Sequence, residues 1–153
     1  MQLLTIFALL CLLGPTLSTR AQEERCRRRA KSAKGMCHNE KEPKLRFTYN
    51  PSTGKCDHFW DLSCDGQILN SFENFTECMT ACNPDSKCLA TPDKHFQFPR
   101  KTSFVFDINI MKCKPEKSLR RPSIGPKINR FLKENDCKKT CEPRLIQIVT
   151  SSG

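Results

Sequence analysis

The cysteines constrain this chain more than any other feature, because there are 11 of them in 153 residues. Such a density in a short chain is typical of an extracellular scaffold whose small core needs disulfide bonds. Cys11 lies in an apolar run near the amino terminus, and the remaining ten form two groups. The first group is Cys26, Cys37, Cys56, Cys64, Cys78 and Cys82, and the second is Cys88, Cys113, Cys137 and Cys141.

The amino-terminal run predicts a secretory signal peptide over residues 1–21. Residues 3–13 are apolar, and Thr19 and Ala21 are small residues at the positions that precede a cleavage site. Cleavage after Ser18 is the alternative. Either cut removes Cys11 and leaves 11 − 1 = 10 cysteines, an even number that can pair completely. The run is too short to span a bilayer, so we expect a secreted, extracellular protein without a transmembrane segment.

A polar, turn-rich stretch at residues 83–87 divides the two cysteine groups and predicts a linker. The predicted domains are residues 22–82 and 88–141, followed by a tail at 142–153. Lys and Arg outnumber Asp and Glu by 11 − 10 = 1 over residues 22–87, but by 14 − 6 = 8 over residues 88–153. The basic character therefore belongs to the second half of the chain.

Both halves show the same order of predicted elements. Leu45, Phe47 and Tyr49 alternate with polar residues, and an apolar run at 104–106 takes the same place in the second half, so each predicts a strand. Each half ends in a Cys-x3-Cys pair, which puts two sulfurs on one face of a helix. Asn74 or Thr76 is the expected cap of the first helix, and the second has no comparable cap.

The cysteine spacings of the first half resemble those of the Kunitz family, typified by pancreatic trypsin inhibitor. The gaps are 10, 18, 7, 13 and 3 residues, the strand ends in the sequence Phe-Thr-Tyr-Asn at 47–50, and Phe59 follows the third cysteine. The resemblance implies a small disulfide-rich α+β fold, with a twisted β-hairpin and a carboxy-terminal helix. It also implies the pairs Cys26–Cys82, Cys37–Cys64 and Cys56–Cys78.

The second half resembles the same family with one disulfide missing. Its gaps are 24, 23 and 3 residues, and Asn129 and Phe131 repeat the relation of Asn70 and Phe72 to the next cysteine. The family's second and fourth cysteines, which bond to each other, are both absent. The resemblance thus implies a second, atypical Kunitz-type domain with the pairs Cys88–Cys141 and Cys113–Cys137.

In inhibitory members of the family, a loop around the second cysteine enters the protease cleft. The resemblance places that reactive loop at Gly35, Met36, Cys37, His38 and Asn39. His38, which would fill the specificity pocket, is a poor anchor for a trypsin-like pocket that selects Lys or Arg. The loop also carries an insertion at residues 40–43, and Leu62 and Ser63 stand where the family has two glycines, so the first domain keeps the fold pattern better than the inhibitory one.

The second half offers positive charge as a binding feature. The predicted basic site consists of Lys112, Lys114, Lys117, Arg120, Arg121, Lys127 and Arg130. Such a segment can bind an acidic exosite of a protein, a heparin-like glycan or anionic lipid, and the alternative is an ordinary solvated face. Nucleic acid is not an expected partner, because the chain has no recognised nucleic-acid-binding motif.

The residues from Asn74 to Thr76 form an N-glycosylation sequon. His38, His58 and His95 are scattered, so we expect no metal site, no cofactor and no catalytic triad. The expected function is that of a monomeric, non-enzymatic antagonist of host clotting serine proteases, similar to the two-domain salivary anticoagulants of ticks. The alternative is a non-inhibitory Kunitz module that blocks an ion channel or binds a heparin-like glycan.

Overall fold

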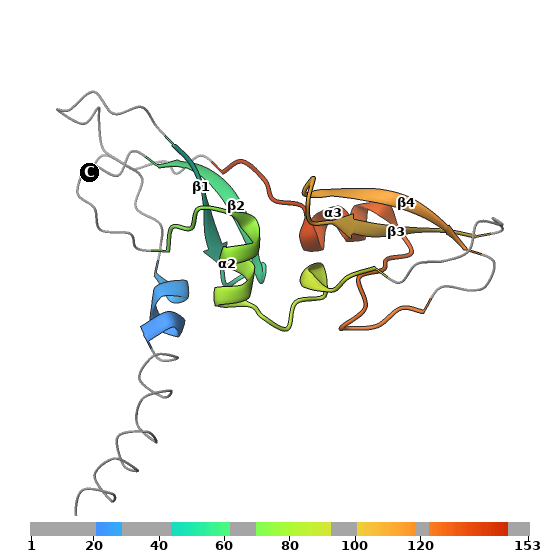
Figure 1. Ribbon diagram of the computed structural model, residues 1–153, viewed down its shortest axis with the longest axis horizontal. Coiled ribbons are helices and arrows are strands. Elements are labelled where there is room, and N and C mark those ends of the chain that lie inside the picture. Colours follow the sequence, from blue (N-terminus) through green and yellow to red (C-terminus); the bar gives the residue numbers. More distant parts are fainter. Residues whose placement is uncertain (1–20, 29–43, 62–69, 93–100, 119–122, 147–153) are drawn as a thin grey trace, which may run out of the picture.

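The computed structural model describes residues 21–28, 44–61, 70–92, 101–118 and 123–146 (Figure 1). Two antiparallel hairpins each pack against a helix of their own. The N-terminal unit contains a helix at 21–27, β1 (Lys44–Asn50), β2 (Lys55–Asp61) and α2 (Phe75–Cys82). The C-terminal unit contains the 3-10 helix η1 (Lys87–Leu89), β3 (Lys101–Asp107), β4 (Lys112–Ser118) and α3 (Glu134–Cys141). The predicted strands and helices are therefore confirmed.

The hairpin of the N-terminal unit turns at residues 51–54, where Gly54 adopts a φ of 67° that favours glycine. Phe47 lies opposite His58 in the register, and its ring packs 6.1 Å from the ring of Phe75 in α2. The alternation of β1 thus directs Phe47 and Tyr49 toward the core, as the two-residue period of a strand requires, whereas Leu45 at the start of the strand is exposed.

The two helices begin differently. Asn74 caps α2, because its side-chain oxygen accepts a hydrogen bond from the Glu77 amide at 2.8 Å. No side chain caps α3, which instead carries Glu134 and Asp136 in its first turn and two lysines in its last. These charges complement the helix dipole. Both observations match the sequence-based expectation.

Among the described residues, two disulfides staple each unit. Cys26 bonds to Cys82 and Cys56 to Cys78 in the N-terminal unit, whereas Cys88 bonds to Cys141 and Cys113 to Cys137 in the C-terminal unit. One bridge of each pair joins the segment before the hairpin to the end of the helix. The other joins the second strand to the helix interior. Cys37 and Cys64 lie outside the described residues.

An asparagine occupies the same structural position in both units. Asn70 accepts from the Tyr49 amide at 2.9 Å and donates to the Tyr49 carbonyl at 2.8 Å. Asn129 makes the same two bonds with Phe106, at 2.9 and 2.8 Å. Each asparagine is almost fully buried and satisfies backbone groups on the outer edge of a hairpin.

The two units share one hydrophobic core. The rings of Phe75 in α2 and Phe106 in β3 pack 5.4 Å apart, and the buried cysteines of both units belong to the same cluster. The segment after α3 runs back to the N-terminal unit and pairs with β2. No helix within the described ranges is long and apolar enough to cross a membrane.

Candidate functional site

The predicted reactive loop, Gly35, Met36, Cys37, His38 and Asn39, lies outside the described residues, as do residues 62–69. The structure describes the base of that loop, where β1 begins at Lys44 and β2 ends at Asp61. Leu45 and Trp60 lie opposite each other at this end of the hairpin. Their side chains are 44% and 54% exposed, so they form an apolar pair beside the chain segments that lead into the loop.

Polar contacts hold the base of the loop. Asn70 donates to the carbonyl of Arg28 at 2.6 Å, the last described residue before the loop. Ser71 donates to the buried carboxylate of Asp61 at 3.0 Å, at the end of β2. Arg46 pairs with Glu73 at 3.4 Å across the same end. These contacts preorganise the chain on both sides of the loop, which lowers the entropy cost of docking.

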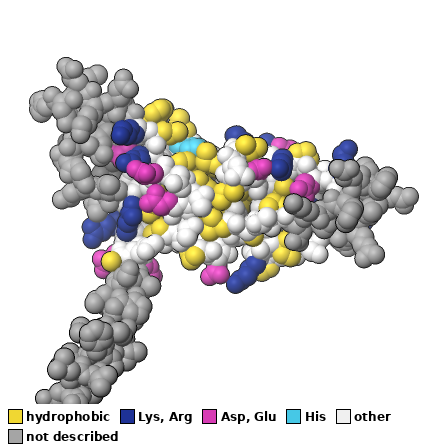
Figure 2. All heavy atoms as spheres, in the orientation of Figure 1, with side chains coloured by type: hydrophobic (Ala, Val, Ile, Leu, Met, Phe, Trp, Pro, Cys, Tyr) yellow, Lys and Arg dark blue, Asp and Glu magenta, His cyan; other side chains and the backbone are white. Residues whose placement is uncertain are grey.

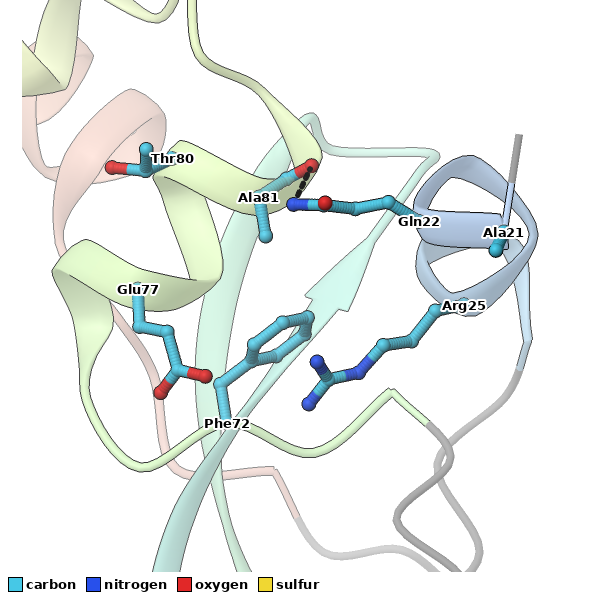
Figure 3. Close-up of a pocket in the computed structure, with 7 residues that line it drawn as sticks. All are labelled: Ala21, Gln22, Arg25, Phe72, Glu77, Thr80 and Ala81. Carbon is cyan, nitrogen blue, oxygen red and sulfur yellow. Dashed lines mark hydrogen bonds between the residues drawn. The ribbon is translucent and has the colours of Figure 1, made fainter. Parts of the chain in front are cut away.

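The helix at 21–27 packs beside α2 and leaves an open hollow of about 470 Å³ between them (Figure 3). Arg25 and Glu77 reach toward the ring of Phe72 from opposite sides. The Arg25 guanidinium lies 4.0 Å from the Phe72 ring centroid and donates to the Ser71 carbonyl at 2.6 Å. The other lining residues are Ala21, Gln22, Thr80 and Ala81.

Most described members of the predicted basic site are neutralised by acidic neighbours. Lys112 lies 3.7 Å from Glu142, Lys114 is 2.7 Å from Asp107, and Lys127 is 3.2 Å from Asp85. The hydrogen bond from Lys114 lowers the pKa of Asp107 and raises the pKa of Lys114. Figure 2 likewise shows basic side chains interspersed with acidic ones on the face in view.

Three further members of the predicted basic site are Lys117, Arg120 and Arg121. Lys117 is exposed and makes no ion pair in the part of the chain that the structure describes. Lys101, which lies outside the predicted basic site, is also exposed. Its register partner is Ser118, whereas that of Lys117 is Thr102, so the two lysines project from opposite faces of the hairpin. Arg120 and Arg121 lie outside the described residues.

The assignment of Arg130 to the basic surface is wrong. Its side chain is 1% exposed, donates to the Ser103 hydroxyl at 2.7 Å and pairs with Glu116 at 2.9 Å. Ser103 and Glu116 are cross-strand partners in the β3–β4 hairpin, so Arg130 closes a buried polar contact on that hairpin. A buried guanidinium that is already paired cannot take part in a surface exosite.

The predicted linker is anchored rather than free. Asn83 donates from its side chain to the Gly54 carbonyl at 2.8 Å, and Ser86 accepts from the Cys88 amide at 3.3 Å. Lys87 belongs to η1, and its ammonium lies 4.2 Å from the Phe131 ring centroid. Burial lowers the pKa of Lys87. The linker thus contributes contacts to both units.

Metal-ligating side chains do not cluster among the residues described. No group of three His, Cys, Asp or Glu side chains there could hold a metal ion. His58 packs its ring 4.9 Å from that of Phe47, and His38 and His95 lie outside the described residues. Burial is the main cause that lowers the pKa of His58. The charge of Asp57 opposes this effect in part, and Lys112 adds a smaller lowering contribution.

Sequence comparisons place these features in a family. The family model of the Kunitz/bovine pancreatic trypsin inhibitor domain matches residues 24–83. Haemaphysalin from Haemaphysalis longicornis is 31% identical over 132 residues, which cover 84% of this chain and 79% of that protein. The chain belongs to the Kunitz family. This family is one of protease inhibitors and not of enzymes.

Other Kunitz relatives are more distant or longer. The Actinia tenebrosa protease inhibitors are 33% identical over 151 residues, covering 92% of this chain but 48% of that protein. An NMR structure of Ixolaris, determined together with its Factor X interaction, is 25% identical and covers 69% of this chain and 86% of its own. Its TM-score of 0.29 is too low to support a shared arrangement of the units.

Proposed function

We propose that this chain is a secreted antagonist of a host clotting serine protease and acts through the loop-bearing end of its N-terminal unit. The observation that carries the proposal is the exposed pair Leu45 and Trp60 at the anchored base of the loop. An exposed tryptophan beside a leucine on a preorganised scaffold has the character of an interface anchor. The similarity to Haemaphysalin supports the Kunitz fold on which this proposal rests.

We propose that the C-terminal unit is a second Kunitz-type domain that lacks the bridge beside the reactive loop. Its two disulfides and its buried Asn129 occupy the same structural positions as those of the N-terminal unit. Without the third bridge, ordering of a reactive loop there would cost entropy on binding. The unit is better suited to contact an acidic exosite through its exposed Lys101 and Lys117.

The two surfaces lie far apart along the molecule. The loop-bearing ends of the β1–β2 and β3–β4 hairpins lie toward opposite ends of the long axis (Figure 1). A protease cleft that accepts residues near Trp60 is therefore not the surface that meets Lys117. The C-terminal unit would contact a separate surface of the target.

The experiment is a panel of clotting and digestive serine proteases assayed with small chromogenic and with macromolecular substrates. Inhibition of both substrate types indicates active-site blockade, and inhibition of the macromolecular substrate alone indicates exosite binding. The panel is repeated with His38→Arg, which creates trypsin inhibition if the loop has the substrate-like shape. Absence of any inhibition by the folded protein, across the panel and both substrate types, would contradict the proposal.

Glycan binding is the second candidate, and the observation in its favour is that Lys101 and Lys117 are both exposed at the open end of the β3–β4 hairpin. Heparin affinity would then depend on these two lysines and fall in Lys101→Gln/Lys117→Gln. Lys114→Gln is the matched control, because Lys114 is already paired with Asp107. Elution of both variants at the same salt concentration would argue against a glycan site here.

A further inference from the structure

Residues 142–146 dock on the outer edge of β2 through an isolated parallel bridge. The His58 amide donates to the Arg144 carbonyl, and the Ile146 amide donates to the His58 carbonyl, both at 2.9 Å. Leu145 lies opposite His58 in a parallel bridge. An edge strand with unpaired amides and carbonyls is a ready site for such strand addition. Here the chain's own carboxy-terminal segment occupies that edge.

Charged side chains of β2 reinforce the docking of this segment. The Asp57 carboxylate accepts from the Arg144 amide at 2.9 Å, and the Lys55 ammonium donates to the Glu142 carbonyl at 2.6 Å. Lys55 and Asp57 are 3.5 Å apart and their side chains are only 3% and 6% exposed. Charge-assisted bonds of this kind are stronger than neutral ones, and buried charges without these partners would be costly. The two residues thus form a charged receptor for the segment's backbone.

Glu142 connects the segment to the other unit at the same time. Its carboxylate accepts from the Cys113 amide in β4 at 2.7 Å and lies 3.7 Å from Lys112. Its carbonyl is the acceptor for Lys55 in β2. One residue at the end of α3 therefore bonds to the second strand of both hairpins.

The corresponding edge of the C-terminal unit cannot accept a strand in this way. Pro115 takes the place of His58, since each lies two residues after the bridged cysteine and opposite a phenylalanine of the first strand. The backbone of Phe47 pairs with that of Phe72, and the backbone of Phe104 with that of Phe131, in the segment before each helix. The free edge of each hairpin is therefore that of the second strand, where His58 and Pro115 lie. Proline has no amide hydrogen, so this edge lacks the donor that His58 supplies.

We propose that residues 142–146 are an intramolecular clamp, specific for the β2 edge, that fixes the two units as one body. The proposal deepens the proposed function and rests on it in one respect: the fixed body presents the Trp60 end and the Lys117 end to one target together. Two surfaces held in fixed geometry bind with higher combined affinity than the same surfaces on a flexible joint, if their spacing matches the target.

The clamp also excludes an alternative role for Arg144. An exposed arginine in an extended segment resembles a protease substrate, but its amide and its carbonyl are both engaged by β2. A protease needs these backbone groups to bind its own strand. Arg144 is therefore not a second reactive site while the clamp is closed.

Two proline variants test the clamp. Ile146→Pro removes the amide that bonds to His58, whereas Leu145→Pro adds a proline to the same segment without removing a bond that the structure shows. We expect amide exchange of His58 to accelerate about fivefold in Ile146→Pro and to change little in Leu145→Pro, since the lost hydrogen bond is worth about 1 kcal/mol to the docked segment. Unchanged protection of the Tyr49 amide, held by Asn70, verifies that the unit stays folded.

Backbone NMR relaxation tests whether the clamp holds the two units together. Inhibition assays test whether this fixed geometry contributes to binding. The wild type should tumble as one body, and a chain that ends at Cys141 should show faster, independent motion of the two units. His58 exchange as fast as a solvent-exposed amide, or one-body tumbling of the shortened chain, would overturn the clamp whether or not the protein inhibits a protease. If the wild type inhibits and the shortened chain inhibits equally well, the clamp stands and its role in binding is overturned.

Discussion

Leu145 and His58 lie opposite each other across a parallel β-bridge that joins the end of the chain to the N-terminal hairpin. Both backbone groups of His58 serve this bridge, and its imidazole packs against Phe47. The Nδ1 atom is buried and has no hydrogen-bond partner among the described residues. A protonated imidazole must donate from both nitrogens, so this environment favours the neutral form.

This environment predicts a pH dependence of stability. The pKa of His58 is lowered from 6.5, so the unfolded chain binds a proton more readily than the folded one. The contribution to stability is present above pH 6.5 and is lost as the pH falls from there through the lower folded pKa. The free energy of unfolding, measured in guanidinium at pH 7.5 and 5.5, should fall more for the wild type than for His58→Phe. Equal falls would show that His58 is not responsible.

Arg130 forms an ion pair with Glu116 and is itself buried. We therefore expect Arg130 to contribute more to stability than an exposed basic residue would. Arg130→Met leaves Glu116 without its partner and should lower the free energy of unfolding by about 3 kcal/mol, near the lower end for buried pairs because Glu116 is 29% exposed. Lys127→Met is the control, since the exposed Lys127–Asp85 pair should contribute about 0.5 kcal/mol or less. Similar losses in urea unfolding for the two variants would contradict this assignment.

Asn74 is both the cap of α2 and the acceptor of the N-glycosylation sequon, and variants can separate these two roles. Its side-chain oxygen accepts from Glu77, whereas the nitrogen to which an N-linked glycan attaches makes no hydrogen bond within the described chain. We propose that Asn74 can be glycosylated while it caps α2. In secreted protein from a eukaryotic host, both Asn74→Ala and Thr76→Ala should lose the glycan mass.

Stability should distinguish the same two variants in unglycosylated protein. Asn74→Ala removes the cap and should cost about 1 kcal/mol in urea unfolding, whereas Thr76→Ala leaves the cap in place. A single mass for the wild type before and after glycosidase treatment would show that Asn74 carries no glycan.

Local patterns were sufficient to predict much of the fold. The alternation at Leu45, Phe47 and Tyr49, the Cys-x3-Cys pairs and the cap at Asn74 each involve neighbours in sequence, and the structure bears them out. The burial of Arg130 could not be foreseen, because it depends on Glu116 and Ser103 in another element. The docking of Leu145 on His58 depends likewise on a contact between the two units.

The central claim concerns the apolar pair at the base of the loop, and one variant pair tests it directly. Trp60→Ser and Leu132→Ser each replace a side chain that is about half exposed, at 54% and 56%, but only Trp60 lies at the loop-bearing end. If the protein engages its protease there, the inhibition constant of Trp60→Ser should rise about tenfold or more, as expected for an aromatic interface anchor. That of Leu132→Ser should stay within about twofold of the wild type. An unchanged inhibition constant for Trp60→Ser would contradict the account.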